Sequence, residues 1–397
     1  MERKLATIRK ISKVEKHPNA DSLDICTVDG WKVVTRLNEF KEGDFAVYFE
    51  VDSFLPIRPE FEFLRKSSYK KLSDGREGFR LKTVRLRGEL SQGLLLPLTI
   101  LSGNKEIYNS DIKNISDTEI IYPILEFVSE PDGYCPTLFW KDEENNFPWK
   151  DEGTKFIELR ENTNITELLE ITKYDPPIGA ILSRDAKGLF PSFLRKTDEE
   201  RIQNIPWILE QYKNEKVYVT EKLDGTSATY YLKDGVFGVC SRNIELKEDE
   251  RSLYWRMAKE YDLENKLKDM GNYAIQGEII GPGIQGNKYK LKTPQLRVFN
   301  IFNIDTQSFL EVKEFSSIVR SYLLLDVPSL EFGIKLSELG ITVSDLLKYA
   351  EDMSLLEPIQ REGIVIRGVD EFNNIRGTSC GRLSFKVISN KYLLKEK

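Results

Sequence analysis

Short runs of alternating apolar and polar residues fill the first hundred positions of the chain. The runs are KLATIRKISKVEK, LDICTVDGWKVVT, DFAVYFEVDSFLP, FRLKTVRLRGEL and QGLLLPL, and turn sequences such as HPNAD, KEGD and SDGREG separate them. Alternation with a period of two is typical of strands that bury one face. The pattern predicts a small β-barrel or sandwich, and the number of strands fits an OB-like barrel.

Longer elements of mixed type begin near Pro177. The expected strands are VYVTE and TSATYYL in one hairpin, FGVCSRNIEL, YAIQGEII, LRVFNIFNI, EGIVIRG and LSFKVIS. In EDERSLYWRMAKEYDLENKLKDM, apolar residues recur three and four positions apart, which predicts one helix, and two further helical stretches are expected between about Leu310 and Leu356. We therefore expect an α+β chain with an OB-like β-barrel domain at 1–130, an acidic connector at 131–176 and an antiparallel-sheet domain at 177–397.

Composition narrows the class of protein. Apolar residues make up 40% and charged residues 31% of the 397 positions, which is typical of a globular chain. The charged segment MERKLATIRK precedes no apolar core of a signal peptide, and no apolar run approaches the length of a membrane span, so we expect a cytoplasmic protein without membrane segments. Four scattered cysteines, at positions 26, 135, 240 and 380, form no C-x-x-C pair and indicate a reducing compartment.

Histidine is almost absent, which limits the possible chemistry. The single histidine, His17, precedes Pro18 in an expected turn. A zinc site made of several histidines, a Ser-His-Asp triad and a Cys-His pair therefore lack parts or are disfavoured. An enzyme with this composition has to rely on Lys, Arg, Asp and Glu.

Charge is distributed unevenly along the chain. Residues 1–98 carry 19 Lys and Arg against 15 Asp and Glu, a balance of +4, and the remainder carries 39 against 49, a balance of −10. Ten basic and four acidic residues lie between Arg58 and Gly88, interleaved with the aromatic residues Phe61, Phe63, Tyr69 and Phe79. Cations that follow phosphates and aromatic rings that stack on bases favour a nucleic-acid groove. The alternative is a solvated loop whose aromatic residues are buried.

A lysine lies at a turn between two expected strands, in Lys222-Leu-Asp224-Gly225. A lysine acts as a nucleophile when its amine loses its proton, and nearby cationic charge promotes this loss. Gly225 permits a tight turn, and Asp224 is suited to hold a metal complex beside the amine. A plain hairpin turn is the alternative. The nearby GPGIQG matches a dinucleotide-binding fingerprint in letters only, because the sequence after it is not helical, and we expect a turn there.

Further polar motifs follow Lys222 in a fixed order. They are Ser241-Arg242-Asn243, Gln276-Gly277-Glu278, the stretch VFNIF from Val298 to Phe302, Glu362-Gly363 and Ser384-Phe385-Lys386. A nucleophilic lysine, polar groups for a ribose, an aromatic ring for a purine, acids for a hydrated metal ion and a second lysine for an α-phosphate are the parts that nucleotidyl transfer needs. Each motif alone is a weak signal, but the ordered set favours this chemistry.

The ordered motifs EKLDGTS, SRN, QGEIIG, VFNIF, EGIVIRG and SFKVIS resemble those of the covalent nucleotidyltransferases, which include ATP-dependent DNA and RNA ligases and mRNA capping enzymes. They are most similar to those of RNA ligases that carry an OB domain ahead of the catalytic domain. The N-terminal KVEKHPNADSLDICTVDG also resembles the opening of OB-type tRNA-binding modules. The resemblance covers about three quarters of the chain and omits the connector.

The resemblance implies a role for each matched residue. Lys222 is expected to be the nucleophile that becomes adenylated, Glu221 to face the adenine edge and Phe299 to stack on the adenine. The remaining expected roles are nucleoside and phosphate contacts for Arg242 and Glu278, an α-phosphate contact for Lys386, a pyrophosphate clamp for Arg201, and metal binding for Asp224, Glu362 and Glu278. Ile388 stands where many relatives have a second lysine, so Lys391 or Lys395 is expected to substitute for it, and Asp305 is a candidate for a further metal-shell acid.

We therefore expect an ATP-dependent RNA ligase that joins 3′-OH and 5′-phosphate ends through a lysyl-AMP intermediate and an RNA-adenylate, for RNA repair. Its expected cofactors are ATP, as covalent AMP, and Mg²⁺, with Mn²⁺ as a substitute, its partner is RNA with nicked or broken ends, and it is expected to be a monomer. The alternatives are a DNA ligase, a capping-type nucleotidyltransferase and a noncatalytic RNA-binding protein with a degenerate nucleotidyltransferase domain. The OB-like domain precedes the motifs and only eleven residues follow Lys386, which favours the RNA ligase.

Overall fold

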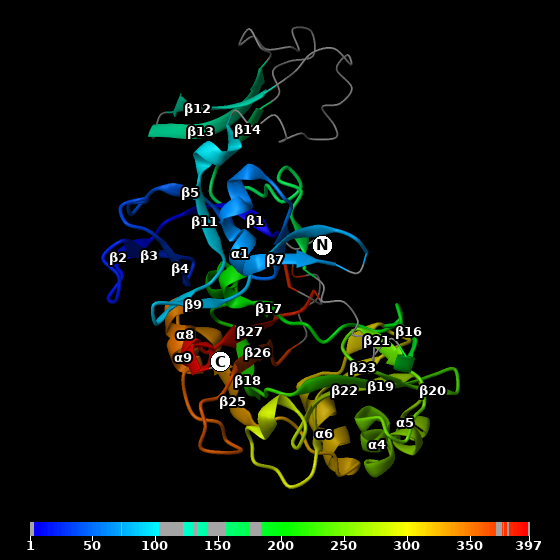
Figure 1. Ribbon diagram of the computed structural model, residues 1–397. Helices are drawn as coiled ribbons and strands as arrows, with labels where there is room; N and C mark the ends of the chain where they lie inside the picture. Colours follow the sequence, from blue (N-terminus) through cyan, green and yellow to red (C-terminus); the bar gives the residue numbers. More distant parts are fainter. Residues whose placement is uncertain are drawn as a thin grey trace. The chain divides into compact units, whose positions relative to one another are not determined.

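The computed structural model describes residues 4–72, 74–102, 122–130, 133–141, 156–174, 184–370, 375, 377–378 and 381–395. The chain divides into two compact units, Glu2–Pro177 and Ile178–Lys397. Figure 1 shows the strands and helices of both units. None of the described helices is long and apolar enough to cross a membrane.

The first unit is built from strands. They are β1 (Ala6–Lys10), β2 (Lys13–Lys16), β3 (Leu23–Val28), β4 (Trp31–Arg36), β5 (Phe45–Phe49), β6 (Ser53–Leu55), β7 (Tyr69–Lys71), β8 (Glu77–Arg80), β9 (Val84–Leu86), β10 (Glu89–Ser91), β11 (Leu94–Pro97), β12 (Tyr122–Glu130), β13 (Gly133–Lys141), β14 (Phe156–Glu158) and β15 (Thr172–Lys173). The short helix α1 (Arg65–Ser68) and two 3₁₀ turns, Pro59–Leu64 and Leu98–Leu101, complete it. The alternating burial along β4 matches the predicted period of two.

Six strands, with β1 and β2 in succession at the first position, form an OB barrel. Strands β2, β3 and β4 form one antiparallel sheet, and β5 pairs with both β1 and β11 in another. The amide of Gln92 donates to the carbonyl of Lys32 at 2.7 Å, and the amide of Val34 donates to the Ser91 hydroxyl at 3.1 Å, which joins β4 to the end of β10, just before β11. The predicted OB-like barrel is confirmed.

Part of the segment expected to be a connector contributes to the core of this unit. Leu159, Ile165 and Leu169 are fully buried among residues of β1, β5 and β6, and β15 pairs with β6. The amides of Leu5 and Ala6 donate to the hydroxyl of Thr166, which ties this segment to the start of the chain. Residues 131–132, 142–155 and 175–176 of the expected connector lie outside the described residues.

Two antiparallel sheets form the second unit. The strands are β16 (Ala186–Leu189), β17 (Glu200–Arg201), β18 (Lys216–Lys222), β19 (Thr226–Lys233), β20 (Val236–Cys240), β21 (Ile244–Leu246), β22 (Tyr273–Ile280), β23 (Gln295–Asn303), β24 (Ser308–Phe309), β25 (Ser329–Lys335), β26 (Gly363–Gly368) and β27 (Ser384–Ile388). One sheet has the order β16-β21-β20-β19-β22-β23-β24, and the other has the order β17-β27-β26-β18-β25. The α+β class with antiparallel sheets is confirmed, and only β17 and β27 run parallel among the sheet pairs described.

Helices cover these two sheets. They are α3 (Ile208–Gln211), α4 (Leu253–Glu260), α5 (Leu263–Met270), α6 (Val312–Ser321), α7 (Leu336–Leu339), α8 (Val343–Ala350) and α9 (Asn390–Lys395), with 3₁₀ turns at Ile202–Asn204 and Gln285–Asn287. Apolar residues of α4, α5 and α6 pack on the seven-stranded sheet, and those of α3, α7 and α8 pack on the five-stranded sheet (Figure 1).

The single helix predicted from Glu248 to Met270 is wrong in two respects, because the helix begins only at Leu253 and is then interrupted. Asp262 has a φ of 48°, in the left-handed region, so the segment forms α4 and α5 with a break between them. Strand β25 was also not predicted, because its sequence SLEFGIK lies between two helical stretches and has half-buried residues on both faces. Cys26, Cys135 and Cys240 are buried free thiols, as expected, whereas Cys380 lies outside the described residues.

Candidate active site

Lys222 lies where the chain passes from one sheet of the second unit to the other. It is the last residue of β18 in the five-stranded sheet, and Thr226 begins β19 in the seven-stranded sheet. The predicted turn Leu223-Asp224-Gly225 is therefore a crossing between two sheets and not a hairpin. Because both sheets reach this crossing, side chains from strands of each can surround the lysine.

Gly225 allows the crossing to lie close against β22. A Cβ atom at this position would come within 2.4 Å of the Ile279 carbonyl oxygen and 2.8 Å of the Glu278 side chain. Any larger residue would push the crossing away from the strand that carries Glu278. The glycine of KLDG is thus required by a tertiary contact, which brings Glu278 near Lys222.

The amine of Lys222 faces carboxylates. Its Nζ atom lies 2.5 Å from Oε1 of Glu362, the residue that immediately precedes β26. Burial alone would lower the pKa of Lys222, but Glu362 and Glu278 outweigh it and raise that pKa above its usual value. Burial raises the pKa of Glu278 to about 8, and Glu362 adds to the rise. The site therefore holds Lys222 as an ammonium ion between acids.

Asp224 is held by residues that the motifs did not point to. Its Oδ2 atom accepts hydrogen bonds from the Lys288 ammonium and from the Tyr392 hydroxyl, each at 2.5 Å. The amide of Asp224 donates to the hydroxyl of Tyr289 at 2.8 Å. Lys288 and Tyr289 follow GPGIQG, which forms a turn as expected, and Tyr392 lies on α9. The only sequence signal for them was a lysine-rich stretch, NKYKLK, directly after a glycine-rich turn.

A second lysine and two arginines lie on the phosphate-facing side expected from the motifs. Lys386 on β27 is paired in register with Arg201 on the parallel strand β17. Burial, followed by the charge of Arg201, lowers the pKa of Lys386 to about 8, and the charge of Lys222 also acts on it. Arg242 follows β20, forms a 2.5 Å ion pair with Asp198 and is near enough to Glu278 to stabilise its charged form.

Phe299 owes its orientation to a β-bulge. Strand β23 pairs Asn300 with Gln276 and Val298 with Gly277, so Phe299 is the extra residue between them. A bulge re-aims the side chain that it inserts. The ring packs against the apolar cluster that contains Leu223, Ile280, Tyr289 and Val327. The guanidinium of Arg367 lies 5.9 Å from its centroid.

Glu221 is buried on the other side of Lys222 in β18. Its Oε2 atom accepts a hydrogen bond from the amide of Leu355 at 2.9 Å. Among the described residues, its Oε1 atom is buried and has no hydrogen-bond partner. Burial raises the pKa of this carboxyl, and hydrogen bonds from the Ser354 hydroxyl and the Leu355 amide act against the rise. A buried acceptor of this kind suits a ligand that donates a hydrogen bond.

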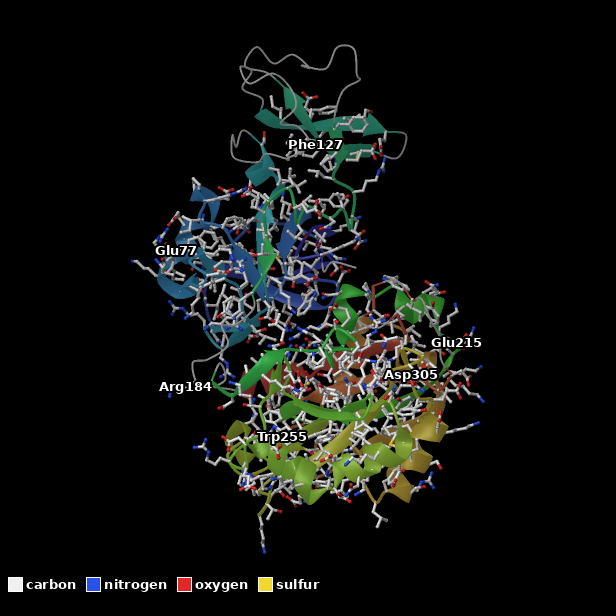
Figure 2. The ribbon with its side chains drawn as sticks, turned by 90° about the vertical axis from the view of Figure 1, so that its right-hand side faces the viewer. Glu77, Phe127, Arg184, Glu215, Trp255 and Asp305 are labelled. Atoms are coloured by element: carbon white, nitrogen blue, oxygen red, sulfur yellow. The ribbon has the colours of Figure 1, made fainter. Side chains whose placement is uncertain are left out.

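One expected residue, Asp305, lies away from this cluster. Asp305, labelled in Figure 2, follows the end of β23 that pairs with Tyr273, whereas Glu278 lies five residues along β22, about 17 Å at the rise of a strand. Asp305 is therefore not a further acid of this site. Lys391 forms an ion pair with Glu351 at 3.3 Å, and the side chain of Lys395 lies outside the described part of the structure.

The acids do not by themselves form a metal cage. Within the described residues, no group of three His, Cys, Asp or Glu side chains is arranged to hold a metal ion. Lys222 and Lys288 instead occupy one oxygen each of Glu362 and Asp224, and the buried Oε2 atom of Glu362 has no hydrogen-bond partner in the described part of the chain. A divalent ion here needs oxygen ligands from water or a substrate, which is usual for Mg²⁺.

Fold and site together define a nucleotidyltransferase: an OB barrel, a two-sheet domain and a lysine enclosed by acids, a second lysine and arginines. A sequence model described as an OB-fold domain matches residues 5–98, and a model described as RNA ligase matches residues 215–388. The chain belongs to the RNA ligase family and is an enzyme that forms phosphodiester bonds.

Solved structures match along the whole chain. Naegleria gruberi RNA ligase with PPi is 34% identical, with 100% of this chain and 99% of that chain covered and a TM-score of 0.71. Mutants of that ligase with AMP and Mn, and with ATP and Mn, are each 34% identical with a TM-score of 0.71, and 99% of both chains is covered. A comparison with curated protein sequences found no match.

Proposed function

We propose that this enzyme uses ATP to seal RNA and that Lys222 is its nucleophile. The observation that carries this proposal is the enclosure of the Lys222 amine, which lies 2.5 Å from Glu362. Glu278 is close enough to raise the pKa of Lys222, and Lys222 is close enough to lower the pKa of Lys386. The solved relatives are bound to ATP, AMP or PPi, which are the substrate, the transferred group and the leaving group of such a reaction.

Three displacement steps account for the reaction. The Lys222 amine loses a proton and attacks the α-phosphorus of ATP; a P–N bond forms, the bond to the β-phosphate oxygen breaks, and pyrophosphate leaves. An oxygen of the RNA 5′-phosphate then attacks the AMP phosphorus, and the P–N bond breaks to return the Lys222 amine. Finally the RNA 3′-hydroxyl loses its proton, attacks the 5′-phosphorus and expels AMP.

Protein charges support the first step. Lys386 and Arg201, paired on neighbouring strands, would contact the α-phosphate and the departing pyrophosphate, because cations placed where charge develops stabilise the transition state. Arg242 and Glu278 would contact the nucleoside and its phosphate side. Because Glu362, and Glu278 when it is ionised, hold Lys222 protonated, this step also requires that their negative charge be offset.

The residues that would hold a divalent cation are Glu362, Glu278 and Asp224. The partnerless Oε2 atom of Glu362 fits this role, and Mg²⁺ or Mn²⁺ would supply the positive charge that lowers the amine's affinity for its proton. Oδ2 of Asp224 already accepts hydrogen bonds from Lys288 and Tyr392. Asp224 would therefore fix the turn that follows Lys222 and face the metal ion with its other oxygen, Oδ1. Removal of divalent ions with EDTA should abolish adenylation, and added Mg²⁺ should restore it.

Glu221 and Phe299 would recognise the adenine base. The buried, partnerless Oε1 atom of Glu221 can accept a hydrogen bond from the exocyclic amine of adenine, and the bulged Phe299 ring can stack on the base. The keto group of guanine would face the same acceptor without a hydrogen to donate. This difference supports ATP over the GTP of capping enzymes.

The remaining proposals concern organisation. We assign RNA binding to the OB-like domain at 1–130 and adenylation to 177–397, with the expected connector at 131–176 contributing in part to the core of the first unit. We further propose a monomer that acts in the cytoplasm on nicked or broken RNA, and sedimentation analysis of the purified protein tests the monomer. A DNA ligase is disfavoured by the RNA ligase match. A noncatalytic protein is disfavoured by the presence of Lys222, Asp224, Glu278, Glu362 and Lys386.

Incubation with α-labelled ATP and Mg²⁺, followed by denaturing electrophoresis, tests the proposal. The parent protein should carry label, and Lys222→Ala should carry none yet still seal an RNA strand that is already adenylated. Lys216→Ala, at an exposed lysine of the same strand, is the matched control and should label as the parent does. Label that persists in Lys222→Ala would place the nucleophile elsewhere.

A further inference from the structure

The basic stretch between Arg58 and Gly88 is less available to RNA than its composition indicates. Phe61 and Phe79 are fully buried in the core of the first unit, so their rings cannot stack on RNA bases. Five of the ten basic side chains form ion pairs: Arg58 with Glu170, Arg65 with Glu62, Lys71 with Glu77, Arg76 with Asp74 and Arg80 with Asp52. Half of the basic residues and two of the four aromatic residues therefore follow the alternative interpretation, a solvated segment with buried aromatics, whereas Phe63 is exposed.

The tip of the β9–β10 hairpin is different. Arg85, Leu86 and Arg87 are exposed, and Arg87 and Gly88 both have positive φ, 50° and 97°, as in a tight two-residue hairpin turn. In the part of the chain that the structure describes, neither guanidinium forms an ion pair or a side-chain hydrogen bond. The hairpin contains one acid, Glu89, against these two arginines, so its charge balance is +1.

A neighbouring loop holds this tip in place. The buried ring of His17 contacts the Leu86 carbonyl through Nε2 at 3.0 Å, and its Nδ1 atom accepts the amide of Asn19 at 3.1 Å. The side-chain amide of Asn19 donates to the Arg87 carbonyl at 3.0 Å. These bonds satisfy both ring nitrogens with one tautomer, in which Nε2 carries the hydrogen. The backbone beside each arginine is thus anchored, which lowers the entropy lost when the cations engage a ligand.

The two segments occupy a defined place in the barrel. His17 and Asn19 lie between β2 and β3, which are the first and second strand positions of the barrel, and the β9–β10 hairpin lies between β5 and β11, the fourth and fifth positions. In OB folds the loops at these two places border the oligonucleotide-binding face. The exposed cations therefore lie where a nucleic-acid backbone can reach them.

We propose that Arg85 and Arg87 form a phosphate-binding tip for RNA, anchored by His17 and Asn19. The ligand is the phosphodiester backbone, because two exposed guanidiniums beside one apolar side chain offer charge and no pocket for a base. The proposal rests on the RNA ligase function proposed above and specifies which part of the first unit grips the substrate. It concerns binding alone and leaves the adenylation residues unchanged.

Binding of full-length protein to a fluorescent nicked RNA duplex, measured without ATP from 50 to 200 mM salt, tests this assignment. R85A/R87A should bind more weakly, and the slope of log affinity against log salt should fall by about two units, since each lost phosphate contact lowers it by about one. K71A/R76A is the control, because it removes the same charge from the neighbouring β7–β8 hairpin where both cations are ion-paired, and its slope should match the parent.

The outcomes separate the two proposals. An unchanged slope in R85A/R87A, or an equal loss in K71A/R76A, would overturn the phosphate-binding tip. R85Q/R87Q repeats the test with side chains of more similar length, and thermal unfolding verifies that each variant folds. Protein-AMP formation from labelled ATP should be normal in R85A/R87A; absence of protein-AMP in the parent would instead refute the ligase mechanism and leave the binding result standing.

Discussion

The hydroxyl of Tyr392 on α9 donates a hydrogen bond to Oδ2 of Asp224, 2.5 Å away and 168 residues earlier in the chain. The ammonium of Lys288 shares the same oxygen and also contacts the Tyr392 hydroxyl at 2.6 Å. Asp224 is part of the crossing that carries Lys222 from one sheet to the other. The last helix of the described chain thus stabilises the turn on which the proposed nucleophile depends.

Removal of this hydroxyl is expected to slow adenylation. A hydrogen bond to a charged group contributes about 1.5–3 kcal/mol, so Tyr392→Phe should lower the rate of protein-AMP formation by about tenfold or more. Lys391→Ala alters the preceding residue of the same helix, whose side chain is exposed and paired with Glu351, and should leave the rate within about twofold. Equal rates for Tyr392→Phe and the parent in a single-turnover assay would show that the contact does not position Asp224.

Glu221 is expected to set the choice of nucleotide. In Glu221→Gln the side-chain amide can place an N–H where Oε1 was, opposite the adenine amine. Both groups are then donors, so no hydrogen bond forms between them. Competition between labelled ATP and labelled GTP for protein-nucleotide formation should then show a preference for ATP reduced by about tenfold, the effect of about 1.4 kcal/mol. A variant with undiminished preference would remove Glu221 from adenine recognition.

The pH dependence of adenylation should report Lys386. Its pKa is lowered to about 8, first by burial and then by Arg201, so the side chain is charged below that pH and neutral above it. Below that pH, kcat/KM for ATP should rise with pH because Lys222 must lose its proton and its pKa is raised; above about 8, the loss of charge on Lys386 should cancel this gain, so the profile should level off. Lys386→Arg keeps its charge at every accessible pH, so its kcat/KM should continue to rise above pH 8. An identical pH profile in the parent and in Lys386→Arg would contradict the assignment.

A buried ionic cluster beside the site is expected to govern stability. Glu199 contacts Arg367 at 3.2 Å and Arg382 at 3.5 Å, and all three side chains are less than 10% exposed. Glu199→Ala would leave two buried cations without their acid, which costs about 3–5 kcal/mol in comparable sites. Denaturant unfolding should show this loss, whereas Glu210→Ala, at an exposed ion pair with Lys213, should change stability by about 0.5 kcal/mol or less. A small loss for Glu199→Ala would mean that water or another group compensates the arginines.

Much of the architecture could be predicted from local patterns. Alternating residues such as those of Trp31–Arg36 place one face of a strand in the core, because successive side chains point to opposite sides. The motifs around Lys222, Glu278, Glu362 and Lys386 could be found because each lies at the end of or within such a strand. The sequence by itself therefore determined most strands of the OB barrel and of the second unit, the ligase family and a set of candidate residues, but not strand β25.

Tertiary structure decided which of these side chains meet. Asp262 adopts a left-handed conformation that breaks the predicted helix, and Asp305 lies at the far end of β22 from Glu278, although its motif neighbour Phe299 reaches the site by a bulge. The contacts of Asp224 with Lys288 and Tyr392 join segments 64 and 168 residues apart. A local pattern records which face of an element is apolar, but not which distant charge lies opposite it, because that depends on how the sheets cross and on where a glycine lets two backbones approach.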